Sequence, residues 1–296
     1  MMNALPEDNY DVRDILIDRR GLWHARGMPV EPARALSQVD VILNALHGGI
    51  GEDGTIARVL ERAGVPYAGS RPLSLALSLN KLRARKEFEK SEILMPRGIT
   101  FTTSLGFTTS EIAQLVFAEF GPPYIVKPGN EGASNGIRMA LTFIELPDVV
   151  GDILDGYGSA IVEEYLRGDE ATVGVIEDFR GEELYALPPA KVLYPEEAPF
   201  LHFGHHTRGE VRHMVPSDFS DVEKRALMDA ARAAHRALEL SHFSRADFIV
   251  TRRGPHLLEV NALPGLYEGA AMPSKLESIG SSVREFLEHA IHLARR

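Results

Sequence analysis

Residues 244–269 read SRADFIVTRRGPHLLEVNALPGLYEG, and this stretch decides the fold of the chain. It predicts two strands, 245–251 and 256–261, joined by a tight Arg-Arg-Gly-Pro connection. Apolar residues fill both predicted strands, which favours a buried hairpin over a surface hairpin with solvated charges.

The polar residues of this hairpin fall on shared faces. Because strand side chains alternate between faces, pairing about Arg253 places Asp247 opposite Glu259 and Arg245 opposite Asn261. A bulge would shift that register. Two carboxylates directly opposite each other repel, so the pair favours a cation between them. Aspartate, glutamate and asparagine offer hard oxygen ligands, so we predict a Mg²⁺ site whose shell is shared with substrate phosphates.

Composition bounds the class of protein. The 296 residues are enough for two domains or three small ones, and 44% hydrophobic and 25% charged residues are ordinary for a globular protein. A net charge of −10 argues against a nucleic-acid partner, and the absence of cysteine excludes disulfides and a thiolate nucleophile. With no apolar run near the roughly 18 residues of a membrane span and no signal pattern, we expect a cytoplasmic protein without a membrane partner.

A glycine-rich turn follows the first apolar run. Residues 39–46, VDVILNAL, predict a buried parallel strand; HGGIGEDG follows at 47–54, and then a helix over 55–63. Such a turn either presents backbone N–H groups to an anion or is a plain tight turn. It is not a P-loop, because it lacks the terminal Gly-Lys-Ser/Thr.

A long helical pattern over 73–90 contains Lys81, and we predict a first domain boundary near residue 80. Taken alone, a lysine on a helix is a solvated charge. Further amphipathic helices are predicted over 221–238 and 281–294.

The strand 124–128, YIVKP, ends in Lys127 and leads into the loop GNEGASNG at 129–136, after which 137–142 resumes a strand. Two strands around such a loop either fold over a triphosphate, with Lys127 meeting its charge, or form a bare hairpin.

A second boundary is predicted where the strand 160–162 runs into Glu-Glu-Tyr-Leu at 163–166. A short extended hinge exposes backbone donors and acceptors that can read an adenine edge, and Glu170 can accept from ribose hydroxyls.

Residues 193–216 are the most irregular segment and contain His202, His205, His206 and His213. Histidines at this density indicate either a metal site or a polar lid whose imidazoles meet phosphate or carboxylate. We favour the lid, because neither cysteine nor a helical His-x₃-His pair accompanies them.

In this order the pieces resemble the ATP-grasp superfamily, and more closely the D-alanine–D-alanine ligase family, from about residue 10 to the C-terminus. The resemblance rests on ALHGGIGEDGTIARVLERAGVPYAGS, LNKLRARK, IVKPGNEGASNG, VEEYLRGDEATVGV and FSRADF with LLEVNALPG. It implies an α/β (α+β ATP-grasp) fold: a shortened parallel-sheet N-terminal domain over 1–80, then two ATP-grasp subdomains, 81–166 and 167–296, that sandwich the nucleotide.

The resemblance also implies a carboxylate–amine ligase that acts through an acyl phosphate, with amino acids or peptides as substrates. On the nucleotide side it implies phosphate contacts from Lys81 and Lys127, a flap containing Ser134, an adenine hinge of Glu163, Glu164, Tyr165 and Leu166, and a ribose contact from Glu170. At the reacting centre it implies Asp247, Glu259 and Asn261 on two Mg²⁺ ions (Mn²⁺ being an alternative), Arg245 and the backbone N–H of Gly265 in an oxyanion hole, His47 as the family's active-site histidine, and His206 in place of a lid lysine.

The amino-acid side departs from the family pattern. The chain begins after the strand and glycine-rich turn whose glutamate holds the first substrate's ammonium. Ala133 stands where the family has a flap serine, Thr207 where it has a lid tyrosine, and Ala270 near its serine for the second substrate's carboxylate. These departures leave open ordinary or relaxed D-alanine ligation, the same chemistry on another amino acid or peptide, and an ATP-binding regulator without turnover. The resemblance further implies a homodimer through the N-terminal region.

Overall fold

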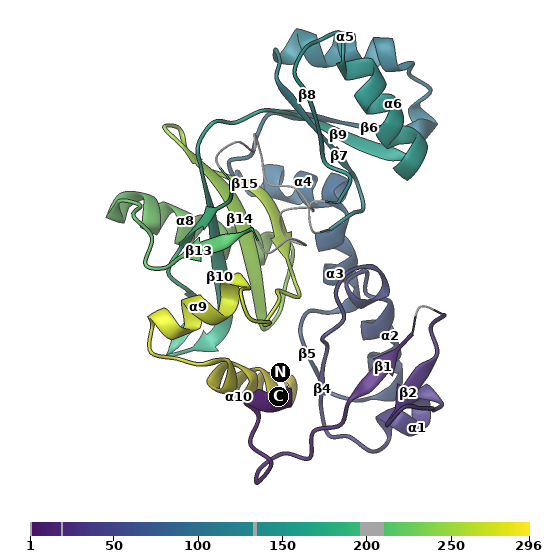
Figure 1. Ribbon diagram of the computed structural model, residues 1–296, viewed down its shortest axis with the longest axis vertical. Helices are drawn as coiled ribbons and strands as arrows, with labels where there is room; N and C mark the ends of the chain where they lie inside the picture. Colours follow the sequence, from purple (N-terminus) through teal and green to yellow (C-terminus); the bar gives the residue numbers. More distant parts are fainter. Residues whose placement is uncertain (1, 19, 133–134, 196–209) are drawn as a thin grey trace.

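The computed structural model describes residues 2–18, 20–132, 135–195 and 210–296. Three groups of elements follow one another along the chain, and Figure 1 shows them as three lobes. Within the described ranges, no helix is both long enough and apolar enough to cross a membrane.

The N-terminal lobe combines two small sheets with short helices. An antiparallel sheet is built from β1 (Ile15–Ile17), β2 (Trp23–Ala25) and β3 (Met28–Pro29), and a parallel pair from β4 (Ile42–Leu43) and β5 (Tyr67–Ala68). The helices are α1 (Pro32–Leu36), α2 (Thr55–Ala63) and α3 (Pro72–Leu79), with short 3₁₀ turns at Met2–Ala4 and Gly49–Gly51. Trp23, Leu36, Ile56 and Leu60 form its buried cluster.

Two predictions for this lobe are corrected by local polar contacts. The apolar run 39–46 is a strand only over Ile42–Leu43 and is half-buried, because the Asn44 side chain donates to the Gly51 carbonyl and accepts from the Leu46 N–H, which turns the backbone. The helical pattern 73–90 is two helices rather than one.

Asn80 divides that pattern. Its backbone is extended (φ −83°, ψ 92°), and its side chain accepts from the Arg83 N–H as the N-cap of α4 (Lys81–Lys90). An asparagine cap of this kind stabilises a helix by about 1 kcal/mol. Lys81 is therefore the first residue of a new helix, not an interior one.

The central lobe is an antiparallel sheet covered by two helices. Its strand order is β6 (Gly98–Thr102), β9 (Ser159–Glu164), β7 (Tyr124–Pro128) and β8 (Arg138–Ala140). A short 3₁₀ turn, Thr103–Leu105, leads from β6 to helix α5 (Thr109–Glu119), and α5 and α6 (Leu146–Tyr157) lie together over this sheet (Figure 1). Ile112, Val116, Val126, Ile153 and Val162 belong to its buried cluster.

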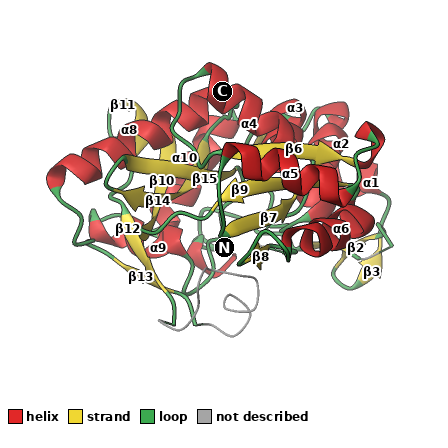
Figure 2. Ribbon diagram, turned by 90° about the horizontal axis from the view of Figure 1, so that it is seen from above, coloured by secondary structure: helices red, strands yellow, loops and turns green. Residues whose placement is uncertain are grey.

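The C-terminal lobe is a six-stranded sheet whose strands occupy the other half of the view in Figure 2. Its path runs β13 (Arg212–Met214), β12 (Ala190–Leu193), β10 (Asp169–Phe179), β14 (Phe243–Thr251) and β15 (Gly254–Asn261), with β11 (Glu182–Ala186) paired to β10. Its helices are α8 (Asp221–Ala237), α9 (Ala271–Ser278) and α10 (Val283–Ala294).

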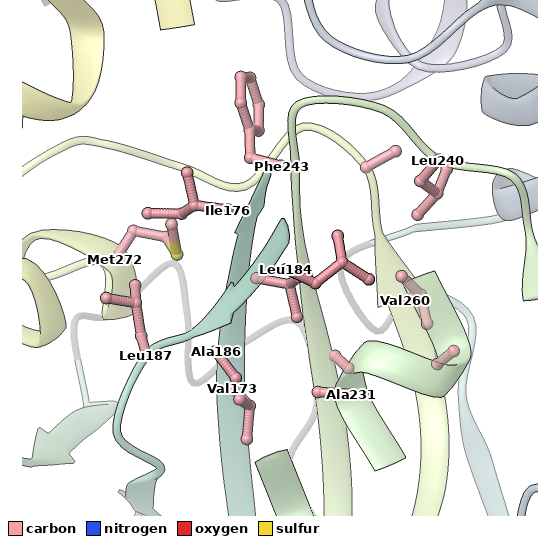
Figure 3. Close-up of a cluster of buried hydrophobic side chains, with 14 of the residues drawn as sticks. Val173, Ile176, Leu184, Ala186, Leu187, Ala231, Leu240, Phe243, Val260 and Met272 are labelled. Atoms are coloured by element: carbon pink, nitrogen blue, oxygen red, sulfur yellow. The ribbon is translucent and has the colours of Figure 1, made fainter. Parts of the chain in front are cut away.

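The largest core packs against both faces of this sheet. Val173 and Ile176 of β10 gather with Leu184, Leu187 and Met272 in Figure 3. Helix α8 contributes buried residues at helical spacing, because Leu227, Ala231 and Ala234 share one face. The same cluster includes Ala57 and Leu75 of the N-terminal lobe and Phe88 of α4, so this core also anchors the N-terminal lobe and the helix that begins at Lys81.

One predicted lid residue has a different setting. His213 lies in β13 and pairs with Val192 of β12, so it belongs to the sheet and not to an irregular lid. The predictions for His202, His205, His206, Thr207, Ala133 and Ser134 concern residues outside the described ranges.

Candidate active site

The hairpin β14–β15 pairs in the predicted register. Asp247 lies opposite Glu259, and Arg245 lies opposite Asn261. All four side chains line one cavity of about 1490 Å³. This cavity is large for a small-molecule site, for which about 300–1,000 Å³ is usual.

A bulge produces this pairing. Thr251 pairs with Gly254, so the hairpin turn has a shorter, two-residue connection than predicted. Along the strands Phe248 pairs with Leu257, and the register then shifts, which leaves Leu258 without an opposite residue. Without that extra residue the strand beyond it would be displaced by one position, and the two carboxylates would point to opposite faces.

Each carboxylate of the hairpin holds a protein cation. Arg245 Nη2 lies 2.7 Å from Asp247 Oδ2, with a second contact of 3.0 Å from its Nε to Oδ1. Lys81 Nζ lies 2.5 Å from Glu259 Oε2. The side chains involved are less than a quarter exposed, so these pairs are only weakly screened by solvent.

The cations keep both acids ionised. Burial raises the pKa of Asp247, but Arg245 and a hydrogen bond from the Thr172 hydroxyl outweigh burial, and the net pKa lies below the usual aspartate value. Burial likewise raises the pKa of Glu259, and the ammonium of Lys81 reverses the shift.

The donor set suits a hard cation. The three side chains at this point offer carboxylate and amide oxygens, and the two protein cations show where positive charge is favoured. Asn261 Oδ1 accepts the Leu263 N–H at 2.8 Å, which holds the amide in place. No cluster of three or more His, Cys, Asp or Glu ligands occurs in the described part of the chain, so a metal here needs oxygens from a ligand as well.

Lys127 lies at the other side of the cavity in a buried ion-pair network. Glu163 receives Lys127 Nζ at 2.7 Å on one oxygen and Arg85 Nη1 at 3.0 Å on the other. All three side chains are about 10% exposed or less. The network joins α4, β7 and β9 and holds Lys127 at the wall of the cavity.

The predicted hinge is held by its own polar contacts. The Glu164 carboxylate pairs with Arg97 at 2.9 Å and with Arg253 at 3.1 Å, so it ties the central lobe to the hairpin turn. The Tyr165 N–H donates to the Pro123 carbonyl at 3.1 Å. The carboxylate of Glu164 is therefore a structural anchor, whatever the hinge backbone binds.

Glu170 is engaged by a tyrosine. The Tyr194 side chain hydrogen-bonds Glu170. Burial is the main cause that raises the pKa of the Tyr194 phenol, and the negative charge of Glu170 is the next. Glu170 lines the cavity together with the hinge residues, and the sequence predicts a ribose contact for it there.

The N-terminal lobe supplies the far end of the cavity. His47 lies 3.9 Å from Glu52 and meets the ring of Tyr267 edge-on, with 6.2 Å between ring centroids. A β-carbon on Gly265 would meet that ring, so a side chain at residue 265 would displace Tyr267. Sequence reasoning singled out neither Tyr267 nor Glu268, because no local pattern marks them.

The cavity collects the predicted residues from all three lobes. Its lining includes every predicted site residue within the described ranges: His47, Lys81, Lys127, Glu163, Glu164, Tyr165, Leu166, Glu170, Arg245, Asp247, Glu259, Asn261 and Gly265. Ser134 and His206 lie outside those ranges. The arrangement can bind a polyanion between two lysines and a hard cation on the hairpin, with Arg245 beside it.

Comparisons with known proteins agree with this arrangement. Residues 25–70 match the family described as D-ala D-ala ligase N-terminus, and residues 92–292 match D-ala D-ala ligase C-terminus. The chain is 34% identical to a D-alanine--D-alanine ligase of Geobacter sulfurreducens, over 89% of this chain and 82% of the relative. It is 32% identical to one from Anaeromyxobacter sp. strain K, over 86% and 79%.

Solved structures share the fold. The VanG D-Ala:D-Ser ligase of Enterococcus faecalis matches with a TM-score of 0.83 at 25% identity, over 99% of this chain and 92% of that chain. The D-alanine--D-alanine ligase of Bacillus anthracis complexed with ATP matches with a TM-score of 0.80 at 23% identity, over 99% and 89%. The predicted mixed α/β fold of the ATP-grasp type is confirmed.

Proposed function

Because this chain belongs to the D-alanine–D-alanine ligase family, we propose that it is an ATP-dependent ligase that joins two amino acids, with D-alanine as the first candidate for both. The observation that carries the proposal is that Lys81 and Lys127 line the same cavity as the hairpin acids and Arg245. A phosphate chain between the lysines places its terminal phosphorus beside the hairpin.

The proposed reaction has two steps. A carboxylate oxygen of the first amino acid attacks the terminal phosphorus of ATP, and ADP leaves. The amine of the second amino acid then attacks the acyl carbon, phosphate leaves, and the amine proton passes to solvent. Arg245 and the backbone N–H of Gly265 lie at the cavity wall where they can stabilise the oxyanion of the second step.

We assign Asp247, Glu259 and Asn261 to Mg²⁺, with Mn²⁺ as a substitute. The metal would neutralise the phosphoryl group during transfer. In the structure Lys81 holds Glu259 and Arg245 holds Asp247, so both cations must move from the acids to the substrates when the metal arrives. Until then they balance the charge of the acids.

We further propose that the boundaries 1–80, 81–166 and 167–296 separate the functional units, and that Glu163 to Leu166 with Glu170 receive the nucleoside. The exposed Leu16, Leu22 and Met28 of the N-terminal lobe support association of two copies through that lobe in the cytoplasm. Sedimentation of a Met28→Lys variant tests the dimer: the variant is expected to sediment as a monomer, and an unchanged dimer would contradict this interface.

A second candidate is the same chemistry with a different acceptor. Ala270 stands near the position where the family has a serine for the second substrate, and in the structure it is buried as the N-cap of α9. Its N–H already donates to the Tyr267 carbonyl at 3.0 Å. A second amino acid would therefore find neither a hydroxyl nor a free amide donor at residue 270.

Phosphate release with a panel of D- and L-amino acids tests the proposal. Release with D-alanine alone supports the first candidate, and release with another acceptor supports the second. ATP binding without release from any member would refute both and indicate a regulator. Glu259→Gln is expected to weaken Mg·ATP binding and abolish turnover, whereas unchanged turnover in that variant would remove the metal assignment.

A further inference from the structure

Helix α9 carries a lysine that none of the proposed roles uses. Lys275 has no exposed surface, and its Nζ donates to Thr172 Oγ1 at 3.2 Å. Burial of an amine is costly unless the amine is paired. The residue lies in α9, five positions after Ala270, and this helix packs against β10.

Thr172 connects this lysine to the proposed metal site. It lies on β10 directly opposite Asp247 on β14, and its hydroxyl hydrogen-bonds the Asp247 carboxylate. An ionised carboxylate only accepts hydrogen bonds, so the single hydrogen of the hydroxyl points to Asp247. The lone pairs of the hydroxyl are then left to accept from Lys275, which keeps N–H donors in either protonation state.

Asp247 therefore has two sets of contacts. Arg245 pairs with it directly, and Thr172, which also lines the cavity, hydrogen-bonds it and accepts from the enclosed Lys275. In the proposed reaction Arg245 leaves Asp247 for the oxyanion, whereas Lys275 is enclosed and has no path to the substrate. Only the contact through Thr172 can persist throughout the cycle.

We propose that Lys275 and Thr172 are positioning residues that hold Asp247 in place as a metal ligand once Arg245 has turned to the substrate. The inference rests on the proposed function only in that Asp247 binds the metal. Polar partners behind a metal ligand orient it, and their loss commonly weakens metal binding by about tenfold or more.

The test is a calorimetric titration of Mg²⁺, or Mn²⁺, into protein with bound ATP and no amino acid. Thr172→Val removes the hydroxyl at constant shape, and Lys275→Met removes the amine. Each is expected to weaken metal binding by about tenfold. Because both act through one chain of contacts, the double variant is expected to be no weaker than about the same tenfold. Thr172→Ser keeps the hydroxyl and is expected to stay within about threefold of the parent.

Met272→Ala separates positioning from packing. Met272 is fully buried on the same helix but lies outside the cavity lining, so the variant should lower the melting temperature without changing metal affinity. Unchanged metal affinity in Thr172→Val and Lys275→Met would overturn the inference. An equal loss of metal affinity in Met272→Ala would also overturn it. The titration needs no turnover, so a protein that binds Mg·ATP but joins no amino acids refutes the ligase proposal and leaves this test decisive.

Discussion

Replacing His213 with glutamine is expected to make the protein less sensitive to acid. Burial lowers the pKa of His213 to about 4, and repulsion from Lys275 and Arg245 adds to the effect of burial. The native state therefore resists protonation of this ring down to about pH 4, while the unfolded chain binds the proton near the ordinary value of 6.5. The contribution of neutral His213 to the free energy of unfolding is thus fully present above pH 6.5 and is lost as the pH falls toward 4.

The size of the loss follows from that difference. Each pH unit between the two pKa values is worth about 1.4 kcal/mol, so the full interval bounds the loss at about 3.4 kcal/mol. Between pH 8 and pH 5 the same linkage gives at most about 2 kcal/mol. We expect about 1–1.5 kcal/mol, because the ring is only partly enclosed and water screens part of the repulsion.

Urea unfolding followed by circular dichroism at pH 8 and pH 5, without ligands, measures this difference in the parent and in His213→Gln. Glutamine stays neutral at both values and keeps an N–H donor, so the variant should lose about 1–1.5 kcal/mol less than the parent. His292→Gln, an exposed position on α10, is the matched control and should behave as the parent. If His213→Gln and the parent lose equal free energy on acidification, the lowered pKa of His213 is refuted.

Three further predictions follow from the fold and the family resemblance. Asn80→Ala removes the cap of α4 and should lower the free energy of unfolding by about 1 kcal/mol. The variant should also raise KM for ATP, because Lys81 begins that helix. An unchanged KM would show that the cap does not affect nucleotide binding. Glu163→Gln leaves two buried cations without a full partner and should lower the free energy of unfolding by about 2–4 kcal/mol in chemical denaturation. Asp152→Asn, in an exposed ion pair, should lower it by less than about 0.5 kcal/mol. Equal effects would show that solvent screens the Glu163 network as it screens a surface pair. Ala133→Ser alone should leave D-alanine turnover nearly unchanged, and a large gain would show that its missing partners are not needed.

The two ion pairs of the hairpin bear on how the site works. Arg245 and Lys81 neutralise the acids that we assign to a metal, so under that proposal bound nucleotide gives these cations new partners when the metal enters. A buried carboxylate deprived of its cation costs several kcal/mol. The proposed metal assignment therefore predicts that bound ATP strengthens Mg²⁺ binding.

Local patterns in the sequence were enough to predict several elements. The helix 55–63 and the strand 124–128 have the predicted bounds, and α8 differs by one residue at its end. Their signals are the periods of 3.6 and 2, which depend on neighbours along the chain. Helix α5 was missed although Thr108 and Glu111 form a capping box that marks its start.

The polar alternation of the hairpin by itself determined which side chains share a face, and therefore the metal hypothesis. Tertiary structure alone decided how they meet. The bulge at Leu258 keeps the carboxylates opposite each other despite a shorter turn, and Asn80 brings Lys81 to Glu259 from a separate helix. Lys275 and Thr172 are 103 residues apart, and no local period can report such a contact, because it depends on how helix α9 packs against strand β10.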